Sequence, residues 1–142
     1  MTRIALVAIT KHGTELAKRL KAAMPEAELL VPGKFASAAP GATVMKEPLS
    51  KEILRWFHDY EEICFAVSVG AVVRMIAPLL KDKHTDPGVV AVDESGRFAI
   101  SVLSGHVGGA NAFCERVAKA LGAQAVVTTA SDVGKTLPVD IL

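Results

Sequence analysis

The amino-acid sequence predicts an α/β protein with three layers: a mostly parallel, twisted sheet with helices on both faces and one β-hairpin. Short apolar runs alternate along the chain with stretches that carry apolar residues at helical spacing, as expected where helices connect parallel strands. The apolar runs contain few polar residues, which is typical of strands covered on both faces. The hairpin is predicted by Asp93-Glu94-Ser95-Gly96, a turn sequence between two apolar runs.

Seven strands are expected from the apolar runs. They cover residues 3–9, 27–31, 43–46, 63–67, 89–92, 98–103 and 125–128. The third is short and is expected at an edge of the sheet. The fifth and sixth form the hairpin.

Four helices are expected between these strands. They cover residues 14–24, 51–58, 71–80 and 110–121. Pro25 ends the first helix, and Pro78 kinks or ends the third. Ser50 is expected to cap the second helix, with Leu54 on its inner face, and Gly122 is expected at the C′ position of the fourth.

Length and composition bound the class of protein. A chain of 142 residues, 51% of them hydrophobic, is one domain's worth, which we expect over residues 1–130, with a tail or linker over 131–142 toward a further domain. A net charge of +1 and 5% aromatic residues give no general attraction for nucleic acid or a membrane surface. The oligomeric state is left open, including a homo-oligomer.

The two cysteines, Cys64 and Cys114, lie inside apolar segments and have no metal-binding or disulfide spacing. They are therefore expected in the core. This cysteine usage fits a reducing compartment, and the N-terminus leads directly into a predicted strand, without the pattern of a secretory leader. We expect a soluble protein of the cytoplasm.

The segment Ser104-Gly105-His106-Val107-Gly108-Gly109-Ala110-Asn111 is the strongest candidate for a functional site. It connects a predicted strand to a predicted helix, where backbone N–H groups are free and the helix dipole is positive. Its glycines let a ligand approach the backbone, and its histidine titrates near neutral pH. The alternatives are that His106 only caps the turn and that the glycines serve only tight packing.

Two other strand-to-helix turns are expected beside this segment, because ligands of open α/β sheets bind at the carboxyl ends of the strands. One turn carries Thr10 and Gly13, and the other carries Gly70. The end of the last strand, with Thr128 and Thr129, is expected at the same edge.

The loop over residues 81–86 is charged and carries Lys81, Lys83, His84 and Asp86. It is either a solvated surface loop or a segment that closes over an anionic ligand. Arg74 lies in the first turn of its predicted helix, against the dipole preference, which favours an anion nearby. The histidines lack the spacing of metal ligands, so no protein-bound metal is expected.

Several segments together, in this order, resemble the CbiG family of cobalamin-biosynthesis proteins. These segments are Thr10–Gly13, Gly70–Pro78, Lys81–Pro87, Val92–Phe98, Leu103–Asn111 and Thr128–Asp132. The resemblance covers essentially the whole chain. It implies the anaerobic corrinoid pathway, in which the δ-lactone of cobalt-precorrin-5A is opened to give cobalt-precorrin-5B and acetaldehyde. The cobalt belongs to the substrate, and no other cofactor is implied.

The hydrolysis needs an activated water and donors for an oxyanion. We hypothesise that His106 is the general base, that the Gly108 and Gly109 amides hold the oxyanion or a carboxylate, and that Asn111 orients the turn. Arg74 and Lys83 are expected to bind carboxylate arms of the corrinoid. A nucleophilic Ser104 is disfavoured, because the GxSxG elbow is absent.

Two alternatives stay open. Family members usually carry a further C-terminal domain, so this chain is either the hydrolase or a non-catalytic corrinoid-docking domain whose chemistry needs that domain or another enzyme of the corrin pathway. A flavodoxin-like or nucleotide-binding regulator fits the fold, but the sequence has neither GxGxxG nor GxxxxGK[ST] at these turns.

Overall fold

The protein, in a computed structural model, is described over residues 3–104 and 109–128. Within them, seven strands form one sheet in the order β3-β2-β1-β4-β5-β6-β7. The strands are β1 (Ile4–Ala8), β2 (Glu28–Pro32), β3 (Thr43–Met45), β4 (Glu62–Ala66), β5 (Gly88–Val92), β6 (Phe98–Leu103) and β7 (Gln124–Val126). The helices are α1 (Lys11–Ala23), α2 (Leu49–Trp56), α3 (Val69–Ile76) and α4 (Ala110–Leu121). Single 3₁₀ turns follow β2, α2 and α3, at Gly33–Phe35, Phe57–Asp59 and Ala77–Leu79.

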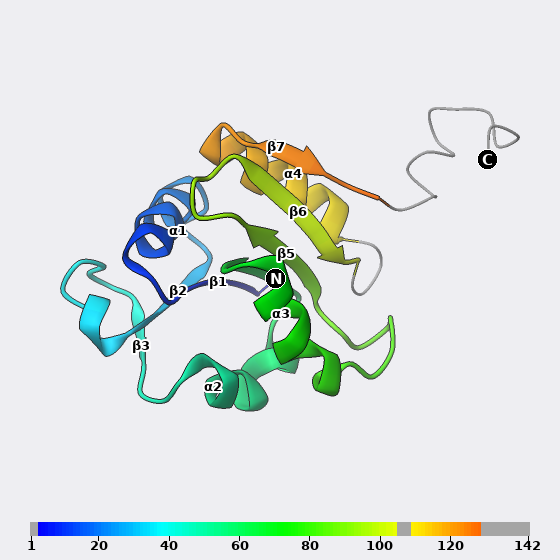
Figure 1. Ribbon diagram of the computed structural model, residues 1–142, viewed down its shortest axis with the longest axis horizontal. Coiled ribbons are helices and arrows are strands. Elements are labelled where there is room, and N and C mark those ends of the chain that lie inside the picture. The colour runs from blue at the N-terminus through cyan, green and yellow to red at the C-terminus, as the bar shows by residue number, and fades with distance from the viewer. Residues whose placement is uncertain (1–2, 105–108, 129–142) are drawn as a thin grey trace, which may run out of the picture.

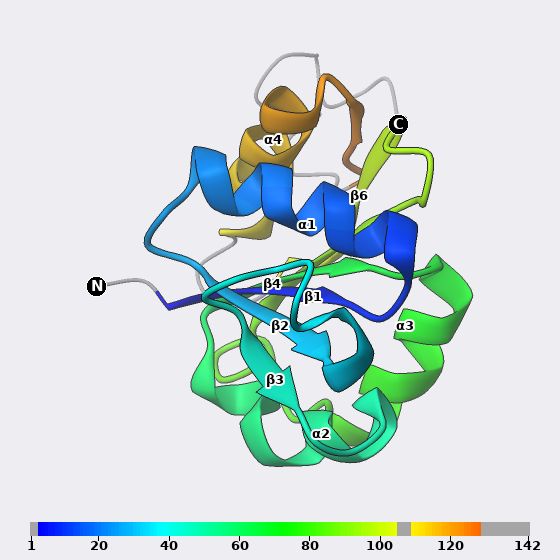
Figure 2. The same cartoon turned by 90° about the vertical axis from the view of Figure 1, so that its left-hand side faces the viewer.

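The helices cover both faces of the sheet, which confirms the predicted three layers. Figures 1 and 2 show α1 and α4 on one face and α2 and α3 on the other. Side chains alternate between the faces along each strand, so Leu6 and Cys64 pack under α1 and α4, whereas Val7 and Phe65 pack on the α2 and α3 side. Both cysteines are buried and free, as expected for core residues.

The direction of the strands changes once across the sheet. β1 to β5 all run in the same direction. β6 pairs antiparallel with β5 through the predicted hairpin, and β7 pairs parallel with β6 across α4. The last two strands therefore run opposite to the first five.

Helix α2 begins two residues earlier than the sequence predicted, with Pro48 rather than Ser50 at the N-cap. The Glu52 carboxylate accepts from the backbone N–H groups of Lys46 and Glu47, which fixes this earlier start. The buried face of this segment is formed by Leu49, Ile53 and Phe57. Leu54 lies off this face and is 64% exposed, so its prediction as an inner-face residue is wrong.

Helix α1 begins three residues, and helix α3 two residues, before its predicted start. α1 begins at Lys11 with Thr10 as its N-cap, and α3 begins at Val69, so the predicted turns at these positions are the first turns of helices. α4 has the predicted bounds, and Gly122 follows it with φ 67°, a backbone conformation that favours glycine.

None of the helices in residues 3–104 and 109–128 is long and apolar enough to cross a membrane. The expected tail over residues 131–142 lies outside the described residues.

Candidate functional site

Strand direction divides the predicted site residues between two opposite edges of the sheet. The amino-end edge is the edge at which β1 to β5 begin, and the carboxyl-end edge is the edge at which they end. Because β6 is antiparallel to β5, Leu103 at its end lies beside Val89 at the start of β5. The turn after β6 therefore lies at the amino-end edge, not at the carboxyl-end edge. The expectation that all three strand-to-helix turns converge is wrong, because the hairpin reverses the direction of the chain.

Thr10 and Gly13 lie at the carboxyl-end edge, where they shape the start of α1. The Thr10 Oγ1 atom accepts a hydrogen bond from the Gly13 backbone N–H at 3.0 Å. A Cβ on Gly13 would lie 2.9 Å from the Ala66 carbonyl oxygen, so glycine lets α1 approach β4 closely. Packing accounts for both residues, and their part in substrate binding stays a prediction.

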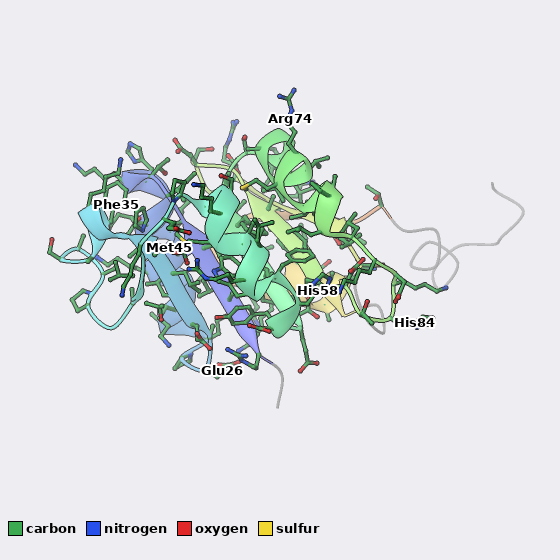
Figure 3. All side chains as sticks on the ribbon, turned by 90° about the horizontal axis from the view of Figure 1, so that it is seen from below. Glu26, Phe35, Met45, His58, Arg74 and His84 are labelled. Carbon is green, nitrogen blue, oxygen red and sulfur yellow. The ribbon has the colours of Figure 1, made fainter. Side chains whose placement is uncertain are left out.

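Gly70 and Arg74 lie at the same edge, exposed on α3. A Cβ on Gly70 would meet no atom within 4 Å, so packing does not require glycine there. Figure 3 shows Arg74 at the outer side of α3, pointing away from the molecule and far from the loop with His84. Within the described part of the chain its guanidinium has no hydrogen-bond or ion-pair partner.

The charged loop before β5 lies at the amino-end edge and is fixed by Asp86. This side chain is buried, with 4% of the residue exposed. Its two carboxylate oxygens accept from the Lys81 backbone N–H at 3.0 Å, and one of them lies 3.0 Å from His58 Nε2. Asp86 therefore holds the loop together, whereas Lys81, Lys83 and His84 remain exposed.

His58, which the sequence analysis missed, belongs to this edge as well. It comes from the 3₁₀ turn after α2 and, with His84, lines a hollow of about 310 Å³. Figure 3 shows both histidines on the same side of the molecule. No local motif marks His58 in the sequence, because Asp86, which orients the His58 ring, is 28 residues away.

The start of α4 is tied to β6 by two hydrogen bonds. The Ala110 backbone N–H donates to the Ser104 carbonyl oxygen, and the Ser101 hydroxyl donates to Asn111 Oδ1, both at 3.1 Å. Gly109 is the N-cap of α4. The predicted site residues Gly105, His106, Gly108 and Thr129 lie outside the described residues.

Thr128 lies at the amino-end edge with Ser104. It follows β7, which runs parallel to β6 and therefore ends at the same edge. Thr128 thus lies beside the end of β6, as expected, but at the edge opposite to Thr10 and Gly70, so the expectation that it joins those two turns is wrong. Thr128 is exposed, and its role in binding stays a prediction.

Glu62, at the start of β4, is a second residue that the sequence analysis missed. It is 9% exposed, and its Oε1 atom has no hydrogen-bond partner among residues 3–104 and 109–128. Burial, with a smaller contribution from Glu61, raises the pKa of its carboxyl to about 7. The sequence feature that could have indicated Glu62 is the position of an ionisable residue directly at the start of an apolar run.

Glu62 lines a cavity of about 490 Å³ between β1, β2, β4 and α4. Arg3 pairs with Glu28 at 2.8 Å, and Arg116 pairs with Glu26 at 2.7 Å, along the same cavity. The hydrogen bonds from the two arginines lower the pKa of both partner glutamates. Glu62 thus differs from the other two glutamates in having no cationic partner in the described residues.

In that part of the chain, no three His, Cys, Asp or Glu side chains are placed to hold a metal ion.

Residues 52–132, more than half of the chain, match the cobalamin synthesis G N-terminal family. The matching segment contains Glu62, the charged loop and the β6–α4 connection. The chain belongs to this family. The resemblance seen in the sequence motifs is thereby confirmed.

Two curated relatives are similar to this protein along nearly the whole chain. The cobalt-precorrin-5A hydrolase of Priestia megaterium is 46% identical over 140 residues, covering 96% of this chain and 37% of that protein. The cobalt-precorrin-5A hydrolase of Salmonella typhimurium is 40% identical over 150 residues, covering 98% of this chain and 39% of that protein. The chain thus spans about two fifths of the length of these relatives.

A solved structure shares the fold. The crystal structure of a cobalamin biosynthesis protein G homolog from Sulfolobus solfataricus matches with a TM-score of 0.63 at 18% sequence identity. The match covers 88% of this chain and 36% of that one. This likeness supports the arrangement of the sheet and helices described above.

Proposed function

We propose that this chain acts in cobalamin biosynthesis, in the hydrolysis that opens the δ-lactone of cobalt-precorrin-5A and gives cobalt-precorrin-5B and acetaldehyde. The observation that carries the proposal is the 46% and 40% identity to two cobalt-precorrin-5A hydrolases over nearly the whole chain. The corrinoid is the proposed partner and supplies its own cobalt, and the cytoplasm is the proposed location.

We place the reaction at the amino-end edge. The start of α4 supplies the positive end of a helix dipole there. Lys81 and Lys83 are exposed on the neighbouring loop, where they suit the carboxylate arms of a corrinoid. His106 as the general base and the Gly108 and Gly109 amides as oxyanion donors remain part of the proposal.

Arg74 needs a separate proposal, because the two edges are a strand length apart, about 17 Å for five residues. A group bound by Lys83 is therefore not shared with Arg74. We assign Arg74, with Gly70 beside it, to a second anion-binding surface at the carboxyl-end edge. Its guanidinium supports this assignment, because it is exposed and has no hydrogen-bond or ion-pair partner among residues 3–104 and 109–128.

A corrinoid-docking domain without catalysis is the second candidate function. It is favoured by the share of the relatives that this chain spans, 37% and 39%. In this case residues 1–130 form a substrate-binding unit, residues 131–142 form the linker, and the remaining region of the relatives carries out the chemistry.

Single-turnover conversion of cobalt-precorrin-5A by the 142-residue chain tests the two functions. Mass spectrometry follows the corrinoid, and a trapping reagent captures acetaldehyde. We expect the product together with acetaldehyde. Corrinoid binding without conversion would instead support the docking domain, and neither binding nor conversion would overturn both.

A further inference from the structure

We propose that Glu62 is a catalytic acid, whose carboxyl donates a proton to the oxygen leaving group of a ligand bound in the cavity between β1, β4 and α4. This inference rests on the proposed lactone hydrolysis and names its proton donor. Glu62 lies at the amino-end edge, on the face of the sheet that α4 covers.

The position of the carboxyl is defined by Gly88 and Ala110. A Cβ on Gly88 would lie 2.2 Å from Glu62 Oε1 and 2.9 Å from the Ala110 Cβ. The carboxyl therefore lies over a glycine of β5 and beside the first residue of α4, a helix of 12 residues. The positive end of the helix dipole is suited to stabilise the carboxylate that proton donation leaves behind.

The cavity has room for a ligand group and the surfaces to hold one. Ile4 and Phe113 give it apolar walls, and its volume is about 490 Å³. Arg3 and Arg116 line it in pairs with glutamates whose side chains are 43% and 45% exposed. Exposed ion pairs are weak, so a carboxylate arm of the ligand can share either arginine.

The charges around Glu62 keep its proton available near neutral pH. Glu61, directly before β4, opposes ionisation. On β2 and the segment before it, Glu28 and Glu26 are neutralised by Arg3 from the start of β1 and by Arg116 from α4, whereas Gly88 of β5 adds no charge. An acid that titrates near the working pH is the most effective general acid.

The reaction assigns one proton to Glu62. Water adds to the acyl carbon of the lactone, and the acyl–oxygen bond then breaks. The leaving alkoxide takes the proton of Glu62 as this bond breaks, which gives a hydroxyl group and the Glu62 carboxylate. The proton of the attacking water goes to the base proposed above and returns through solvent to Glu62, so that one water is consumed in total.

The test compares Glu62→Gln with the wild-type chain and with Glu61→Gln, a variant of the exposed neighbour. Glutamine keeps the size of the side chain but cannot donate an acidic proton. Single-turnover conversion of cobalt-precorrin-5A is measured from pH 5.5 to 8.5. Isotope-edited infrared spectra are recorded on protein labelled at the glutamate carboxyl carbon. The band of the protonated Glu62 carboxyl is identified as the one that is missing from Glu62→Gln.

We expect the wild-type rate to fall as the pH rises through about 7, which is the pKa of Glu62. Glu62→Gln should be slower by about 100-fold without this fall and with unchanged corrinoid affinity. Glu61→Gln should keep the wild-type rate at pH 5.5 and still show the fall, which moves to lower pH because one charge that opposes the ionisation of Glu62 is removed. A normal rate and pH profile in Glu62→Gln would overturn the assignment alone. If the wild-type chain does not convert the corrinoid, the hydrolysis proposal fails. If, in addition, the infrared band of Glu62 does not shift when the corrinoid is added, the proposed contact between Glu62 and the ligand is overturned as well.

Discussion

A single buried carboxyl, that of Glu62, is expected to make the stability of this protein depend on pH. Its pKa is about 7 in the folded protein, whereas in the unfolded chain it titrates near its ordinary value of about 4.3. Because the folded state binds this proton more tightly, the free energy of unfolding falls as the pH rises from about 4.3 through about 7. Glu62→Gln should therefore be more stable than the wild type at pH 8, by about 1–3 kcal/mol, and similar to it at pH 4.5.

Urea unfolding at both pH values measures this difference, with Glu61→Gln as the control for the removal of an exposed charge. An equal stability difference between Glu62→Gln and the wild type at pH 4.5 and pH 8 would contradict the raised pKa in the folded protein.

Asp86 shows how one side chain can define a loop. Asp86→Ala removes both acceptors of the Lys81 backbone N–H and the partner of His58. Since Asp86 is buried, we expect a loss of about 1–3 kcal/mol in the free energy of unfolding. Asp82→Ala is the matched control, because the exposed Asp82 carboxylate also accepts loop N–H groups. Chemical denaturation should rank Asp86→Ala clearly below Asp82→Ala, and the reverse order would refute the role of Asp86.

At the scale of the elements, the sequence predicted every strand and α-helix of the described residues but not the order of the strands in the sheet. Hydrophobic periodicity identifies an element, whereas the neighbours of a strand depend on contacts distant in the sequence. The hairpin between β5 and β6 was predicted from its turn residues, yet its consequence, the reversed direction of β6 and β7, was missed. The predicted site was therefore assembled at one edge when its residues lie at two.

Helix α3 offers a test of its earlier start. Gly70 lies in its first turn, where a Cβ would meet no atom within 4 Å. Gly70→Ala should therefore stabilise the protein, by up to about 1 kcal/mol. Gly88→Ala is the opposite case, because its Cβ would lie 2.2 Å from Glu62 Oε1, and overpacking of this kind costs about 1–3 kcal/mol. Thermal unfolding compares the two, and a destabilised Gly70→Ala would show that the position needs glycine for another reason.

Over the whole molecule, the sequence predicted part of the proposed site and missed the rest. Lys81, Lys83, Asp86, Ser104 and Thr128 were predicted and lie at the amino-end edge. Glu62 and His58 were missed, because burial and a partner 28 residues away decide their chemistry, and neither is visible in a local motif. The loop lysines and Arg74 were expected together and are separated by the length of the sheet strands.

This separation predicts which cations a single bound corrinoid uses. If the ligand lies at the amino-end edge, removal of both loop charges in Lys81→Ala/Lys83→Ala should weaken corrinoid binding by about 10-fold, since each exposed contact contributes up to about 1 kcal/mol. Arg74→Ala should leave the affinity of that site within about twofold. The binding is measured by titration followed in the corrinoid absorption bands at low and high salt, because the lysine contribution should shrink as ions screen it. Weaker binding by Arg74→Ala with no effect of the double variant would move the site to the carboxyl-end edge, where Glu62 could not reach the ligand.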